Sequence, residues 1–179
     1  MNRRLQIGVM GPSLTNYPAD KALALKLENY SEEIGKLLAE RNVLVLTGGC
    51  TGVMESVMRG AKRAGGTTIG FPGKSFGESN SYCDIEVLLD FDIASFAFSG
   101  MVSSHSLITF PTESAGTVLE ITSAYRHKIP NVLLRGFNPD FEKRYPKYYD
   151  ASKSIEFYWA NTPNESVDLA IKLGLERTR

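Results

Sequence analysis

The sequence predicts an α/β protein with a doubly wound, mainly parallel sheet of about six or seven strands and helices on both faces. Short apolar runs alternate with longer amphipathic segments along the whole chain, which is typical of βαβ units. A length of 179 residues suits one domain, and 42% hydrophobic with 22% charged residues is ordinary globular composition. We therefore expect a single domain over residues 1–179.

The first half of the chain contains four predicted strands and two predicted helices. The strands are short apolar runs at Leu5–Met10, Val43–Leu46, Thr67–Phe71 and Asp84–Leu89. Apolar residues recur every three or four positions in Ala22–Glu40 and from about Gly52 to Ala64, which indicates amphipathic helices. The stretch from Pro72 to Asn80 is rich in turn residues and is the best candidate for a mobile loop.

The second half continues the alternation. We expect, in order, a helix at Ile93–Val102, a strand at Ser106–Phe110, a helix at Ser114–Lys128 and strands at Val132–Leu134 and Ile155–Trp159. Residues 136–154 are rich in Pro, Tyr and charge without a clear period, so we interpret them as an irregular surface crossing. Thr162 to Glu165 form a capping box that begins a last helix, predicted to end at Gly174.

Composition excludes several classes of function. Lys and Arg together number 20, as do Asp and Glu, and this zero net charge argues against nucleic-acid binding through bulk charge. The two cysteines and two histidines form no metal-binding pattern, so we expect no metal site. No apolar run approaches the roughly 18–20 residues that span a bilayer, which predicts a soluble, cytoplasmic protein without membrane contact.

Three loops that follow predicted strands carry the candidate binding residues. Glycines and hydroxyls at a helix start let an anion approach backbone N–H groups. Each loop taken alone also fits a tight turn or a helix cap, but in open parallel sheets such loops converge on one ligand site. The candidate ligand-binding residues are Gly11 and Ser13 in the first loop, Gly48, Gly49, Gly52 and Met54 in the second, and Ser114, Gly116 and Thr117 in the third.

These loops resemble the successive blocks of the Lonely Guy (LOG)-like Rossmann proteins, also labelled lysine decarboxylase-like. The matching blocks are Gly11–Ser13, Thr47–Glu55, Gly60–Gly70 and Ala115–Glu120, and the branch with molybdenum-cofactor carrier proteins is most similar. The resemblance implies a nucleotide-binding Rossmann domain and a homodimer. It also implies that the enzymes of this group hydrolyse the N-glycosidic bond of a nucleoside 5′-monophosphate.

Two departures from the family pattern bear on catalysis. The motif Pro-Gly-Gly-x-Gly-Thr-x-x-Glu implies a phosphate contact for Gly116 and Thr117 and a catalytic role for Glu120. Here Glu113 and Ser114 replace its paired glycines, which brings a carboxylate toward the expected phosphate site. The arginine that the enzymes carry falls on Phe96, and no Lys or Arg lies between Lys74 and Arg126.

We therefore expect a binding or carrier protein for a nucleotide-like phosphate ligand, either a nucleoside monophosphate or a pterin cofactor. The alternative is a nucleoside 5′-monophosphate phosphoribohydrolase with Glu120 as its catalytic residue. No cofactor is required, and nucleotide, phosphate or a molybdopterin-type molecule is the expected ligand. The expected homodimer uses the helices that begin near Ile93 and Ser114. Arg126 faces roughly 120° away from Glu120 around its helix, so it reaches a cleft only from the partner subunit.

Four further groups have two interpretations each. Phe96 either packs in the core or offers a stacking surface for a ring, and His105 is either structural or a general base. Cys50 is either a small packing residue or a reactive thiol. The tyrosine-rich stretch from Tyr145 to Tyr149 forms surface packing or a dimer contact, or else it contacts a partner or nucleic acid.

Overall fold

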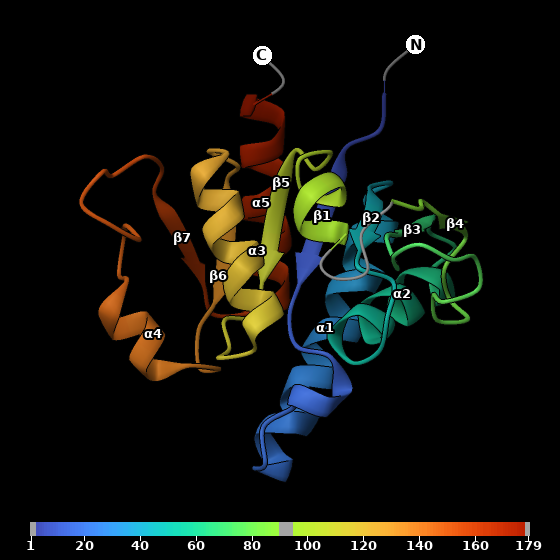
Figure 1. The fold of residues 1–179 in the computed structure, drawn as a ribbon, viewed down its shortest axis with the longest axis horizontal. Coiled ribbons are helices and arrows are strands. Elements are labelled where there is room, and N and C mark those ends of the chain that lie inside the picture. The colour runs from blue at the N-terminus through green and yellow to red at the C-terminus, as the bar shows by residue number, and fades with distance from the viewer. Residues whose placement is uncertain (1–2, 90–94, 178–179) are drawn as a thin grey trace.

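The protein is described by a computed structural model, which covers residues 3–89 and 95–177 and contains one seven-stranded sheet (Figure 1). The strand order is β4-β3-β2-β1-β5-β6-β7, and every pairing is parallel. The strands are β1 (Gln6–Met10), β2 (Leu44–Thr47), β3 (Thr68–Gly70), β4 (Ile85–Glu86), β5 (Ser106–Thr109), β6 (Asn131–Leu134) and β7 (Phe157–Ala160). The α/β doubly wound prediction is confirmed.

Helices cover both faces of the sheet. In Figure 1, α3 lies in front of the strands and α5 behind them. One buried cluster joins α1, α2 and α5 to side chains such as Ile7 and Ile108. A second joins η2 and α3 to the opposite face through Met10 and Leu107. The helices are α1 (Lys21–Glu40), α2 (Val53–Arg63), α3 (Ala115–Arg126), α4 (Pro139–Arg144) and α5 (Pro163–Arg177), with short η1 (Leu14–Asn16) and η2 (Phe96–Gly100).

The strand order reverses direction at β1. Strands β2 to β4 extend from one side of β1, and strands β5 to β7 extend from the other. Chain connections therefore leave the carboxyl ends of β1 and β5 toward opposite faces. This reversal opens a crevice at the carboxyl edge of the sheet, where ligands bind in open α/β folds.

Several predicted elements differ from the observed ones. Residues 136–154 contain α4, so the interpretation of an entirely irregular crossing was wrong. Asn138 caps this helix because its side-chain oxygen accepts the Phe141 N–H at 3.0 Å, and Pro139 occupies the first turn. Strand β4 has two residues rather than six, and α5 continues past Gly174 to Arg177. The π-helical η2 replaces part of the predicted helix, whose first residue, Ile93, lies outside the described residues.

Helices α1 and α2 pack unusually closely through two glycines. A Cβ atom at Gly35 would lie 1.9 Å from the Val57 carbonyl oxygen, and one at Gly60 would lie 1.9 Å from the Glu32 carbonyl oxygen. At one side of this contact the Arg59 guanidinium bonds Glu28 at 2.8 Å and Glu32 at 2.9 Å. This contact fixes α2, and with it the glycine loop that precedes α2.

Candidate functional site

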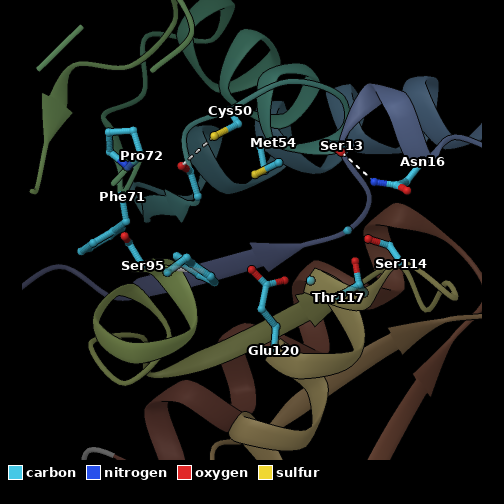
Figure 2. Close-up of a pocket in the computed structure, with 14 residues that line it drawn as sticks. Ser13, Asn16, Cys50, Met54, Phe71, Pro72, Ser95, Ser114, Thr117 and Glu120 are labelled. Atoms are coloured by element: carbon cyan, nitrogen blue, oxygen red, sulfur yellow. Dashed lines mark hydrogen bonds between the residues drawn. The ribbon is translucent and has the colours of Figure 1, made fainter. Parts of the chain in front are cut away.

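A cleft of about 290 Å³ lies at the carboxyl ends of β1, β2 and β5, where the strand order reverses. Figure 2 shows side chains from both sides of the sheet pointing into it. The volume is close to the lower limit of small-molecule pockets, about 300 Å³. The lining residues are Gly11, Ser13, Asn16, Gly48, Cys50, Met54, Phe71, Pro72, Ser95, Phe96, Ser114, Gly116, Thr117 and Glu120.

The first two loops are tied together behind this lining. The Val53 N–H donates to the Pro12 carbonyl at 3.1 Å. Gly52 has a φ of 73°, and a Cβ atom there would lie 2.6 Å from the same carbonyl oxygen. Gly49 has a φ of 80°, and its carbonyl accepts the Asn80 side-chain amide at 2.8 Å. Gly49 and Gly52 therefore shape the loops without lining the cleft, unlike the other predicted binding residues.

One end of the cleft is polar and is formed by the start of α3. Ser114 is the N-cap residue, but its side chain makes no capping hydrogen bond, and the first turn contains no acidic residue. The nearest atom to a Cβ at Gly116 would be the Ser114 hydroxyl at 4.0 Å, so this backbone is open to the cleft. The Thr117 hydroxyl is buried and has no hydrogen-bond partner among the described residues. Helix N-terminal N–H groups and a free hydroxyl are donors for a bound anion.

The opposite end is apolar and contains sulfur atoms. Figure 2 places Cys50, Met54, Phe71 and Pro72 there. Phe96 is 2% exposed, and its ring meets the Phe71 ring edge-on with centroids 5.9 Å apart. A Cβ at Gly8 would lie 2.8 Å from the Phe96 ring, so this ring packs directly on β1. This burial supports the packing interpretation of Phe96, whose ring also forms part of the cleft wall.

Glu120 lies between the two ends, with its carboxyl group directed into the cleft (Figure 2). No Lys, Arg or His belongs to the described lining. Burial raises the pKa of Glu120 to about 8, so the carboxyl group is mostly protonated at pH 7. Burial also raises the pKa of the Cys50 thiol, and the Glu78 and Glu120 carboxylates add to that rise. The described lining is therefore almost uncharged at neutral pH.

Two residues that the sequence analysis considered for the site do not line the cleft. Glu113 lines a neighbouring groove between α3 and α4 instead of the cleft, so its carboxylate is not part of the described phosphate end. His105 accepts the Gln6 backbone N–H at 3.0 Å through Nδ1, which supports a structural role. Sequence reasoning missed Asn16, Phe71, Pro72 and Ser95, and of these Asn16 had a signal as a polar residue in the first glycine loop.

Within residues 3–89 and 95–177, no group of three or more His, Cys, Asp or Glu side chains is placed to hold a metal ion. The helices of the same part of the chain include none that is long and apolar enough to cross a membrane.

Solved structures with similar folds include proteins that bind the molybdenum cofactor. The Moco carrier protein of Chlamydomonas reinhardtii is 28% identical, with a TM-score of 0.81 over 97% of this chain and 99% of that one. The molybdenum cofactor binding protein of the phototrophic bacterium Rippkaea orientalis is 26% identical, with a TM-score of 0.80 over 96% of this chain and 98% of that one. The protein TM1055 is 29% identical, with a TM-score of 0.80 over 94% and 99%.

More distant structures share the fold alone. DNA processing protein A of Streptococcus pneumoniae is 11% identical, with a TM-score of 0.64 over 92% of this chain and 61% of that one. A search of curated proteins finds no match. The model of the SLOG cluster4 family matches residues 4–167, which is nearly the whole chain. The predicted resemblance to the LOG-like superfamily is confirmed, and this chain belongs to the SLOG cluster4 family of that superfamily.

Proposed function

We propose that this protein binds a small phosphate-bearing ligand, a nucleoside monophosphate or a pterin cofactor, as a binding or carrier protein. The observation that carries the proposal is the open start of α3, where the bare Gly116 backbone and the unpartnered Thr117 hydroxyl face the crevice of a doubly wound sheet. Backbone donors hold phosphate without a cation, because the helix dipole and free N–H groups both favour negative charge.

The two ends of the cleft give the ligand one orientation. The phosphate lies at Ser114, Gly116 and Thr117, and the ring lies against Phe71 and Met54. The protonated Glu120 carboxyl group between them offers one donor and one acceptor to a sugar or a ring edge. The cofactor-binding proteins of Rippkaea and Chlamydomonas support a pterin as the ring.

The test is calorimetric titration with AMP and with inorganic phosphate at pH 7. We expect saturable binding of at least one of these probes by the wild type. Thr117→Val retains the shape of the side chain and removes only the hydroxyl, and it should weaken binding about tenfold, the effect of one lost hydrogen bond. Equal affinity of Thr117→Val and the wild type would contradict the placement of the phosphate at α3.

Hydrolysis of a nucleoside 5′-monophosphate is the second candidate function, and one observation favours it. A carboxylic acid whose pKa is raised to about 8 is suited to protonate a departing base as a general acid. Against this, the described lining has no cation to stabilise the charge that develops on the ribose phosphate, and one such contact contributes about 100- to 1000-fold in rate.

Base release from AMP separates the two functions. The carrier proposal expects saturable binding with very slow release by the wild type. Turnover that Glu120→Ala abolishes would instead establish the hydrolase. Comparing Arg126→Ala then shows whether the missing cation comes from that residue.

A further inference from the structure

We infer that the groove between α3 and α4 is a docking site for an arginine side chain of a partner protein. The loop between β5 and α3 separates this groove from the cleft, because Thr112 and Glu113 line the groove whereas Ser114 and Gly116 line the cleft. A protein docked there lies beside the proposed phosphate end, where it is placed to deliver or receive the ligand. The docking itself does not depend on the proposed function.

The tyrosine-rich stretch of the sequence forms an aromatic wall of this groove, which has a volume of about 260 Å³. The rings of Tyr145 and Tyr149 are stacked, with centroids 4.6 Å apart and an angle of 11° between their planes. The Phe141 ring lies next to them, with its centroid 4.7 Å from that of Tyr145. Aromatic faces attract cations, and the planar guanidinium group of arginine stacks on them. The wall therefore favours an arginine side chain.

Two carboxylates without partners lie at the same groove. Glu113 precedes α3 and Asp140 is in the first turn of α4. Both are exposed, and neither forms an ion pair or a side-chain hydrogen bond with the described residues. Glu142, also on α4, is already paired with Arg135 at 3.4 Å. The two unpaired carboxylates outnumber Arg144, the one basic residue of the described lining, so the groove attracts a cation.

Arg144 shows how a guanidinium group meets the aromatic wall. Its guanidinium carbon lies 5.3 Å from the centroid of the Tyr145 ring, which is a cation–π contact within one chain. No described ion pair joins Arg144 to Glu113 or Asp140, although all three side chains line the groove. A second guanidinium group therefore finds both carboxylates available, and pairing with them offsets its repulsion from Arg144.

A buried hydroxyl is an independent indication of a bound group. Thr112 lines the groove, and its hydroxyl is buried without a hydrogen-bond partner among the described residues. Leaving such a group unpaired is costly, and a guanidinium group has five N–H donors for this hydroxyl and the two carboxylates. A lysine ammonium has three donors and no plane that can stack, so arginine fits better. Tyrosine and arginine are enriched in protein interfaces, which favours a protein as the occupant.

An NMR titration of the backbone amides with acetyl-Gly-Arg-Gly-amide tests the groove. We expect saturable shifts at the residues of the groove, with a dissociation constant on the order of 1 mM from one charge-assisted contact and one cation–π contact. The citrulline peptide has the shape of the arginine peptide without its charge, and it should bind about tenfold more weakly or not at all. No saturable shift at the groove, or equal binding of the citrulline peptide, would overturn the inference.

Two other probes decide the class of occupant. We expect methylguanidinium and acetyl-Gly-Glu-Gly-amide both to bind more weakly than the arginine peptide. Methylguanidinium that binds as tightly as the peptide would assign the groove to a small free cation. Tighter binding of the glutamate peptide would assign it to an anion held by Arg144. Either result would overturn the inference.

Substitutions of the carboxylates test the ion pairs. Asp140→Asn and Glu113→Gln should each weaken binding of the arginine peptide about 2- to 5-fold, the effect of one lost ion pair at an exposed site. Glu40→Gln is the matched control, because Glu40 is an exposed acid at the end of α1 and the change should leave the affinity unchanged. Unchanged affinity in both groove variants, or an equal loss in Glu40→Gln, would overturn the inference.

A pair of substitutions at Tyr145 tests the aromatic wall. Tyr145→Phe retains the ring and should bind the arginine peptide as tightly as the wild type does. Tyr145→Leu removes the ring and should weaken binding about 2- to 5-fold, the effect of an exposed cation–π contact. Equal affinity of these two variants would also overturn the inference.

This inference and the proposed function fail separately. Normal binding of AMP or phosphate without binding of the arginine peptide would overturn this inference and leave the proposed function standing. Binding of the arginine peptide in the groove of a protein that binds neither AMP nor phosphate would do the reverse.

Discussion

The α1–α2 contact and the cleft use glycine in opposite ways. At Gly35 and Gly60 the missing side chain lets two backbones touch, and a Cβ atom would lie 1.9 Å from a carbonyl oxygen. At Gly116 the missing side chain leaves space, with the nearest atom 4.0 Å from a Cβ. The space beside Gly35 and Gly60 is occupied by the neighbouring backbone, whereas the space beside Gly116 is open to a ligand.

The α1–α2 contact and the cleft also differ in whether their charged and polar groups have partners. The α1–α2 contact has paired charges, in which Arg59 bridges two glutamates. Among the residues that line the cleft, none takes part in a described ion pair, and the one carboxyl group is mostly protonated at pH 7. The structural contact is thus held by pairs already made, while the cleft retains donors without partners. A residue type alone does not tell the two uses apart.

The largest expected effect is on stability at the α1–α2 contact. Gly60→Ala forces a Cβ against the Glu32 backbone, which has no flexible end to move aside, and should cost about 3 kcal/mol or more. Urea unfolding measures it. The matched control is Gly116→Ala, which should be neutral or should stabilise the helix by up to about 1 kcal/mol. Equal losses for both variants would contradict the distinction between the two kinds of glycine.

The next effect is on binding at the cleft. Gly116→Val should weaken AMP or phosphate binding at least about tenfold, because the branched side chain occupies the approach to the backbone N–H groups. Calorimetry measures the affinity, and thermal unfolding should show a stability close to that of the wild type. Unchanged affinity would show that the anion does not lie over this backbone.

A smaller effect concerns the pH dependence of stability. The pKa of Glu120 is about 8 in the folded chain against 4.5 for a free side chain, so the folded state holds this proton more tightly. As pH rises from 4.5 to 8 the unfolded state loses the proton first, and the free energy of unfolding falls. Glu120→Gln removes this loss and should be more stable than the wild type by about 1–3 kcal/mol at pH 7.

The difference between Glu120→Gln and the wild type should vanish near pH 4.5 and level off above pH 8. Urea unfolding of both proteins at several pH values measures it. A difference that is independent of pH would mean that Glu120 is not buried as a neutral acid, and that the cleft is charged after all.

The smallest effect is on thiol reactivity. Because burial raises the pKa of Cys50, a disulfide reagent at pH 8 should label it about tenfold more slowly than a free cysteine peptide. Bound AMP or phosphate should slow the reaction further, because Cys50 lines the cleft. Cys83 lies outside the lining of the cleft. In the Cys50→Ser variant only Cys83 can be labelled, so this variant gives the labelling rate of Cys83 as a control. If the ligand slows the labelling of Cys83 and not that of Cys50, the ligand does not bind in the cleft beside β2.

The parts of this fold that could be predicted from sequence are those that a local residue pattern determines. The seven strands were found because buried strands are short apolar runs, and the loops Gly11–Ser13 and Ser114–Thr117 were found because glycines and hydroxyls follow them directly. Helix α4 was missed although Asn138-Pro139 is a capping signal, because six residues are too few for a periodic pattern.

The rest of the cleft depends on tertiary contacts. Phe71 and Pro72 line it only because β3 pairs with β2 in a register that brings its end to the same edge. Gly49 and Gly52 look like binding residues in sequence, yet their positive φ angles serve contacts with neighbouring loops. No local pattern separates a glycine that approaches a ligand from one that approaches another loop.

The reversal of strand order also makes the site a late product of folding. Strands β4 to β1 come from the first half of the chain and strands β5 to β7 from the second, and within the sheet the two halves pair only where β1 lies beside β5. The polar and apolar ends of the cleft lie across that seam, so they come together only after a pairing between residues about a hundred positions apart in the sequence. A ligand in the cleft ties both halves together. Ligand binding as proposed above requires that residues beyond Glu120 have emerged during synthesis, and a bound ligand would then oppose the separation of β1 from β5.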